Sequence, residues 1–172
     1  EIDLSNNPAL TYFPAYENQL ATIDFSGAVN LEDIAVYQNQ LTEIDVSMCP
    51  NLELLDCQDN AIISIDISNN PKMEYLSASN NQLTELNLKN GNNQGLTYLY
   101  ARNNPNLTCV TVDDEELINH GNTWVVDGIA NFSENCGHFT TQKTYIPDDN
   151  FEQALIDLGY GDDVLDDSVM TG

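Results

Sequence analysis

Apolar residues recur along the chain in a fixed frame that contains an asparagine. In one copy of this frame, Leu52, Leu55 and Cys57 come before Asn60, and Ile62 follows it. The framing asparagines are Asn18, Asn39, Asn60, Asn81 and Asn104. The first three intervals between them are 21 residues and the last is 23, so the chain contains five copies of one unit. Self-similarity at this period is typical of a leucine-rich repeat.

Two short segments of each copy alternate apolar and polar residues, which is the period of a β-strand. The first segment contains Leu55 and Cys57, and the second is Ile65-Asp66-Ile67. The second segment begins at Ile2, Ile23, Ile44, Ile65 and Leu86 in the five copies. Because two strands leave no room for a long helix in 21 residues, we predict a mostly β leucine-rich-repeat solenoid over residues 1–108. Its copies share one continuous core that a single copy cannot build.

The repeated asparagine follows the first strand, at the point where the chain turns inward. A buried asparagine amide offers hydrogen bonds to backbone groups that no regular strand ladder satisfies. We therefore predict that these residues are structural and that they stack into an internal asparagine ladder. The ladder would contain Asn18, Asn39, Asn60, Asn81 and Asn104.

The segment after the last copy, residues 109–143, is rich in apolar residues. They include Val110, Val112, Leu117, Trp124, Val125, Val126, Ile129 and Phe132. An open solenoid exposes its last strand and the core beneath it. We therefore predict that residues 109–143 form a C-terminal cap.

The composition changes again over residues 144–172. Phe151, Leu155 and Leu158 recur at helical spacing, so we predict a short helical segment there. Clustered aspartates follow it at positions 162, 163, 166 and 167. Carboxylate oxygens are calcium ligands, but this cluster lacks the D-x-D-x-D-G order of a calcium loop. Weak calcium binding is one interpretation, and a solvated acidic segment is the favoured one.

The charge of the chain excludes some classes of partner. Its net charge is −24, with only four lysines and arginines. Nucleic-acid binding needs clustered basic residues, and an anionic membrane surface would repel this protein. No apolar run approaches the length of a transmembrane helix, so we expect no membrane insertion. The chain begins inside a repeat without an initiator methionine, so we expect a piece of a longer protein.

The four cysteines lie in different settings. Cys57 occupies an inward column of the repeat, where a small buried thiol is ordinary. Cys49 lies in a turn, and the sequence does not decide whether either thiol is free. Cys109 and Cys136 bracket the segment after the last copy, and no Cys or His spacing indicates zinc. We predict a disulfide between Cys109 and Cys136, which would place the protein in an oxidising compartment.

No group of residues indicates catalysis. His120 and His138 lie in or beside the predicted cap, away from any nucleophile that the sequence places. Paired carboxylates abound because acidic residues abound, and no glycosidase pair stands out. We therefore predict no enzyme, no cofactor and no metal site.

Six of the eight tyrosines occupy outward positions of the first strand, on one face of the solenoid. Solenoids often bind partners on such a face, and exposed tyrosines favour interfaces. The candidate binding residues of this tyrosine face are Tyr12, Tyr16, Tyr37, Tyr75, Tyr98, Tyr100 and Arg102. Tyr98, Tyr100 and Arg102 form the expected hot spot, because tyrosine and arginine are enriched in such spots. The alternative is that tyrosine is simply a good strand residue.

The motifs quoted above also carry a family resemblance. The frame from Leu52 to Pro71 resembles the 21-residue leucine-rich repeats of secreted and surface proteins of Bacteroidota, especially marine flavobacteria. Residues 104–110, with Trp124 and residues 132–136, look like the C-terminal cap of that family, whose paired cysteines correspond to Cys109 and Cys136. Residues 145–156 look like the helical segment that begins a further leucine-rich-repeat domain in the same proteins.

This resemblance implies a non-catalytic module of a secreted or cell-surface protein. The leading hypothesis is protein–protein interaction or adhesion through the tyrosine face. The alternatives are a glycan-binding accessory module of a polysaccharide-degrading protein and a passive spacer between other domains. The sequence identifies neither the ligand nor the oligomeric state.

Overall fold

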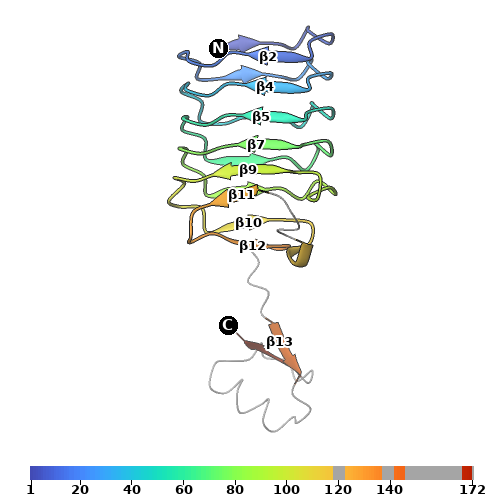
Figure 1. Cartoon of the computed structure of the whole chain (residues 1–172), viewed down its shortest axis with the longest axis vertical. Helices are drawn as coiled ribbons and strands as arrows, with labels where there is room; N and C mark the ends of the chain where they lie inside the picture. Colours follow the sequence, from blue (N-terminus) through green and yellow to red (C-terminus); the bar gives the residue numbers. More distant parts are fainter. Residues whose placement is uncertain (118–122, 137–141, 146–167, 172) are drawn as a thin grey trace. The chain divides into compact units, whose positions relative to one another are not determined.

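The structure is a computed structural model, which describes residues 1–117, 123–136, 142–145 and 168–171. The chain separates into two compact units, Glu1–Glu134 and Asn135–Gly172. The first unit is a parallel, leucine-rich-repeat-like β-solenoid of about six turns, each of about 21 residues (Figure 1). The predicted fold class is confirmed.

One side of the solenoid is a six-stranded parallel sheet. Its strands are β2 (Tyr12–Pro14), β4 (Asp33–Ala35), β5 (Leu54–Asp56), β7 (Tyr75–Ser77), β9 (Tyr98–Ala101) and β11 (Thr123–Val126). Leu55 of β5 pairs with Ile34 on one side and Leu76 on the other. All three side chains are fully buried, so each copy adds one residue to the same inward row.

The second side of the solenoid is interrupted. Its strands are β1 (Ile2–Asp3) and β3 (Ile23–Asp24), which pair together, and β6 (Ser64–Asp66), β8 (Glu85–Asn87), β10 (Cys109–Thr111) and β12 (Asn131–Ser133), which form a four-stranded parallel sheet. The segment predicted to start a strand at Ile44 forms none, which separates the two sheets. Val46 is buried and Asp45 is exposed, so this copy still fills the core without pairing its backbone.

A continuous apolar core lies inside the turns. Leu31, Leu52, Met73 and Leu96, which open the second to fifth copies of the frame, are fully buried, and so are Ile62 and Leu83 after the asparagine. Burial of a leucine-sized side chain contributes about 1.5–3 kcal/mol. Exposed ion pairs contribute at most about 1 kcal/mol each. With four basic residues in the chain, apolar burial is what holds the copies together.

The framing asparagines connect each copy to the one before it. The Asn81 Nδ2 donates to the Cys57 carbonyl of the preceding copy at 3.0 Å and to the Ala78 carbonyl of its own turn at 3.1 Å. Its Oδ1 accepts the Ile62 N–H at 2.9 Å. The same set of bonds is made by Asn39, Asn60 and Asn104. Asn18, the first of the series, donates to the Ala15 and Tyr16 carbonyls of its own turn.

The residue before each asparagine has a left-handed backbone, with φ between 54° and 59°. These residues are Glu17, Gln38, Asp59, Asn80 and Asn103. The conformation directs the N–H toward the next copy, so Asp59 N–H donates to the Ser79 carbonyl at 3.0 Å. In the fifth copy the acceptor is a side chain. The Asp127 carboxylate accepts the Asn103 N–H at 3.0 Å and the Asn104 N–H at 2.7 Å.

The residues expected as a cap continue both sheets through β10, β11 and β12, and a short 3-10 helix, η1, spans Glu115–Leu117. The Trp124 indole N–H donates to the Leu96 carbonyl at 2.7 Å, and its ring centre lies 5.5 Å from that of Phe132. Trp124 and Phe132 are partly buried against the core. The segment therefore covers the last copy by adding one more turn that lacks the leucine and asparagine frame.

The described part of the second unit contains β13 (Gln142–Tyr145) and β14 (Ser168–Thr171), which pair antiparallel. The sequence did not predict this pairing. The expected helix with Phe151, Leu155 and Leu158 lies outside the described residues. The acidic cluster at 162–167 and both histidines also lie outside them.

The cysteines divide as the sequence indicated. Cys109 and Cys136 are both disulfide-bonded, so the predicted disulfide is confirmed. Cys49 and Cys57 are free and buried. Burial raises the pKa of the Cys49 thiol to about 11, and it raises the pKa of Cys57 further. Since the thiolate is the reactive form, both thiols are held in an inert state at neutral pH.

The first prediction concerns the asparagine ladder. Asn81→Ala leaves the buried Ile62 N–H without its acceptor, while the Cys57 carbonyl loses one of two amide donors and keeps the Asn60 Nδ2 at 3.1 Å. Because an unsatisfied buried N–H costs roughly 1–3 kcal/mol, we expect the free energy of unfolding to fall by about 2 kcal/mol in urea titrations. Asn18→Ala is the matched control, and it should cost less than about 1 kcal/mol because its amide donates to carbonyls of its own turn. Equal losses in the two variants would show that the bonds between copies add nothing.

The second prediction concerns the thiols. Iodoacetamide added to the native, unreduced protein should label none of the four cysteines within an hour, because two are bonded and two are buried. In urea, mass spectrometry should find label on Cys49 and Cys57, while Cys109 and Cys136 stay unlabelled until a reductant is added. Native labelling of Cys57 would mean that its turn opens readily.

Candidate functional site

The outward positions of the six-stranded sheet form rows that the strand register defines. In one row Tyr12 lies beside Asp33, then Leu54, Tyr75 and Tyr98. A second row contains Pro14, Ala35, Asp56, Ser77 and Tyr100. The first row therefore carries tyrosines on both sides of Asp33 and Leu54, whereas Tyr100 is the one tyrosine of the second row.

The tyrosine rings gather in two clusters. Tyr16 and Tyr37, just beyond the ends of β2 and β4, stack with ring centres 4.6 Å apart and planes 3° apart. Tyr75, Tyr98 and Tyr100 form the second cluster, with ring centres 5.9 to 6.4 Å apart. Stacked and tilted pairs at these separations fix the ring positions beyond what area burial alone does.

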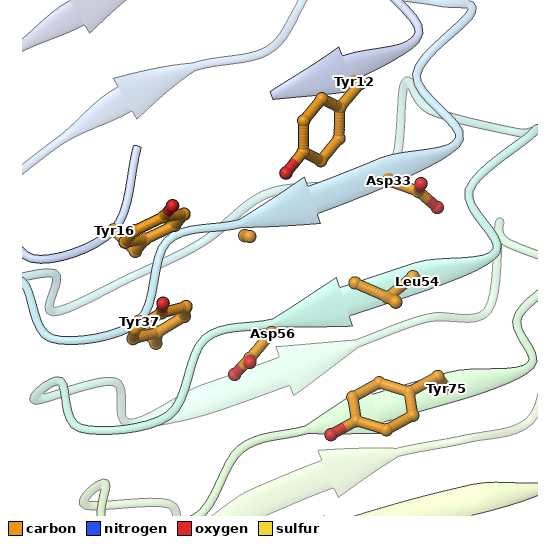
Figure 2. Close-up of a pocket in the computed structure, with 8 residues that line it drawn as sticks. Tyr12, Tyr16, Asp33, Tyr37, Leu54, Asp56 and Tyr75 are labelled. Carbon is orange, nitrogen blue, oxygen red and sulfur yellow. The ribbon is translucent and has the colours of Figure 1, made fainter. Parts of the chain in front are cut away.

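A groove of about 580 Å³ lies where the smaller residues interrupt the tyrosines. Figure 2 shows its floor on β4 and β5, with Asp33, Leu54 and Asp56. Its walls are Tyr12 on β2, the stacked Tyr16 and Tyr37, and Tyr75 on β7. The eight lining residues are Tyr12, Tyr16, Asp33, Ala35, Tyr37, Leu54, Asp56 and Tyr75.

The electrostatics of the groove centre on Asp56. Its partial burial raises the pKa of the carboxyl group, while hydrogen bonds from the Gln58 N–H and the Ser77 side chain act against the shift. The bond from Gln58 is long, at 3.4 Å, so it compensates little. Burial also raises the pKa of Tyr37 and of Tyr75, and the Asp56 charge adds to both shifts. The groove therefore disfavours added negative charge.

The structure brings together four of the seven candidate binding residues. Tyr12, Tyr16, Tyr37 and Tyr75 line the groove. Tyr98 and Tyr100 adjoin it through their ring contacts with Tyr75. Arg102 is exposed and does not line the groove.

Sequence analysis missed Asp33 and Asp56, although both stand in the outward rows. Their signal is that Asp33 interrupts the row of Tyr12, Tyr75 and Tyr98, and that Asp56 follows in the adjacent row of the next strand. The groove also lies over the first four strands of the sheet, whereas the expected hot spot lies at β9. The position of the groove along the rows depends on both side-chain size and ring orientation, and the sequence does not give the orientation.

Other kinds of site find no support in the part of the chain that the structure describes. There, no group of three His, Cys, Asp or Glu side chains is placed to hold a metal ion. Within the same residues, no helix is long and apolar enough to cross a membrane. What the groove offers is a recognition surface of tyrosine rings and carboxylates.

Comparison with solved structures finds a likeness in fold. The chain is similar to the functional domain of InlJ from Listeria monocytogenes, which includes a cysteine ladder. The match has a TM-score of 0.57 at 24% sequence identity, and it covers 80% of this chain and 29% of that chain. This chain thus spans less than a third of the InlJ chain. No family model and no curated protein matches.

The third prediction follows from two aspartates with opposite environments. Asp56 has a raised pKa in the fold, so its ionisation opposes folding as pH rises above the ordinary value of 3.8. Asp45 has a lowered pKa because the Ser47 side chain and N–H donate to it, so its ionisation favours folding above the same pH. At pH 7 Asp56→Asn should therefore raise the free energy of unfolding, and Asp45→Asn should lower it. Urea titrations at pH 7 and below pH 3.8 test this, and both differences should shrink at the lower pH. Shifts of the same sign at pH 7 would contradict the assignment.

Proposed function

We propose that this chain is a non-catalytic binding module of a secreted or cell-surface protein. It engages a partner protein through the tyrosine face, for interaction or adhesion. The observation that carries this proposal is the groove, which is walled by four tyrosines on an open sheet.

The exposure of the rings favours binding over a purely structural role. Cross-strand tyrosine pairs do stabilise a sheet, and the ring contacts account for that part. However, Tyr12, Tyr16 and Tyr98 remain 53%, 42% and 44% exposed. Sheet stability does not require this free area, whereas an interface uses rigid amphipathic rings at low entropic cost.

Two further observations favour a place outside the cell. A disulfide at Cys109 and Cys136 is typical of oxidising compartments. The similar InlJ structure is described as the functional domain of its protein, so in InlJ the domain that resembles this chain has a function of its own. Neither observation names a partner.

A glycan is the second candidate ligand. Exposed tyrosine rings can stack on the apolar faces of sugars, and the carboxylates of the groove can accept hydrogen bonds from sugar hydroxyls. A spacer without a ligand is the third candidate, and it would leave the exposed rings without a role.

The fourth prediction tests the tyrosine face directly. The soluble chain is applied to parallel arrays of surface proteins and glycans, beside the triple variant Tyr12→Ala, Tyr16→Ala and Tyr98→Ala. These three rings are exposed, so their loss should keep the fold, at about 0.5–1.5 kcal/mol for each ring pair that is lost, while it weakens binding by about tenfold or more. The ligand class is read from the array that responds.

The matched control removes exposed apolar area elsewhere. Met48 and Ile63 are 51% and 52% exposed and lie outside the six-stranded sheet. The double variant Met48→Ala and Ile63→Ala should bind as the parent does. Equal losses in the two variants would remove the tyrosine face from the proposal, and silence of the parent on both arrays would favour the spacer.

A further inference from the structure

The groove has the chemistry of a site for a positively charged group, and its lining residues supply no positive charge. Its eight lining residues include two aspartates and four tyrosines, and none of the eight is basic. Asp33 and Asp56 lie on neighbouring strands, in adjacent outward rows. Both carboxylates therefore line the groove, and no basic side chain among the lining residues balances their charge.

Asp56 is the more constrained of the two carboxylates. It is half-buried in the floor, and it accepts a long backbone bond from Gln58, at 3.4 Å, and a bond from the Ser77 side chain. The cost of removing this charge from water is therefore only partly offset inside the protein. A positive group in the groove would offset it, since a charge-assisted hydrogen bond is roughly twice as strong as a neutral one.

The aromatic walls restrict the shape of that positive group. Tyr16 and Tyr37 are held parallel by their stack, and Tyr75 is held by Tyr98 and Tyr100. Tyrosine faces attract cations that lie over the ring. A planar guanidinium can stack on a ring and also donate two parallel hydrogen bonds to a carboxylate, which an ammonium group cannot do.

The size and charge of the surroundings fit a polypeptide carrier. The groove crosses four strands spaced about 4.8 Å apart, so it spans about 14 Å, which is the reach of about four extended residues. The net charge of −24 attracts a basic segment as it approaches, although salt screens this attraction beyond about 8–10 Å. A neutral sugar could stack on the rings and donate hydrogen bonds to the carboxylates, but it would not neutralise their charge.

We propose that the groove binds an arginine side chain on an extended basic segment of the partner protein. Asp56 supplies the counter-charge, and the rings of Tyr16, Tyr37 and Tyr75 supply the walls. This inference rests on the proposed function, because it names the partner class of the same face.

The fifth prediction uses three defined probes. They are the peptide acetyl-Ser-Gly-Arg-Gly-Ser-amide, the same peptide with citrulline in place of arginine, and the neutral sugar cellotetraose. Citrulline keeps the shape of arginine and removes its charge. In amide NMR titrations at about 0.15 M salt, the arginine peptide should shift the signals of residues 33–35 and 54–56. The citrulline peptide should bind at least about tenfold more weakly.

Two variants with the same change of charge separate the groove from the general field. Asp56→Asn should raise the dissociation constant of the arginine peptide by about tenfold. Glu85→Gln removes one charge from β8, on the other side of the solenoid, and should change the dissociation constant by less than about twofold because salt screens it. Circular dichroism checks that both variants are folded.

Each contrary outcome has a defined meaning. Equal binding of the arginine and citrulline peptides, or equal effects of the two variants, would overturn the arginine site. Tighter binding of cellotetraose at the same amides would replace it with a glycan site. If the peptides fail while an array ligand is lost in the tyrosine variant, this inference falls and the proposed function stands. If neither experiment shows binding, both fall.

Discussion

The asparagine amide that reaches from one copy to the copy before it is the constraint on which the rest of the structure depends. The strands are only two to four residues long, so they supply few backbone hydrogen bonds to hold the copies in place. Between the strands, backbone bonds such as that from the Asp59 N–H to the Ser79 carbonyl also join the copies, but the acceptor of the Ile62 N–H is a side chain. Asn81 satisfies an N–H and a carbonyl of the preceding copy with one side chain. Because these partners belong to the preceding copy, the bonds fix both the spacing and the rotation between copies.

The tyrosine face is a consequence of this fixed register. Tyr75 and Tyr98 are 23 residues apart in sequence, yet the register makes them neighbours across two strands. A residue type repeated at the period of the copy therefore becomes a row, and an interruption of the row becomes a hollow. The groove lies at such an interruption, where Asp33 and Leu54 stand between Tyr12 and Tyr75. The groove is acidic because the chain has few basic residues to place beside its acids.

Much of the fold could be predicted from the sequence, because few arrangements of the chain bury all the repeated leucines and also satisfy the hydrogen bonds of the repeated asparagines. The sixth turn could not be predicted from the frame, since it lacks the leucine and asparagine positions. Trp124 and Asp127 make its contacts with the fifth copy instead. The absence of a strand at Ile44 could not be predicted either. The alternation of buried and exposed residues is intact there, and only the backbone pairing is absent. The tyrosines were found from their outward positions. The groove depends on the parallel stack of Tyr16 and Tyr37, which spacing does not determine.

The Asp127 carboxylate ends the ladder by presenting two oxygens where a further copy would present two carbonyls. The terminus of the stack is thus saturated locally, by a residue that does not depend on how many copies come before it. A gene duplication or deletion of one whole copy between Asn39 and Asn81 would keep every junction of the ladder chemically identical. Array length can then change by integral steps during evolution without any new terminal sequence. Each added step would also lengthen the rows of the tyrosine face by one strand, so the reach of the surface is set by copy number.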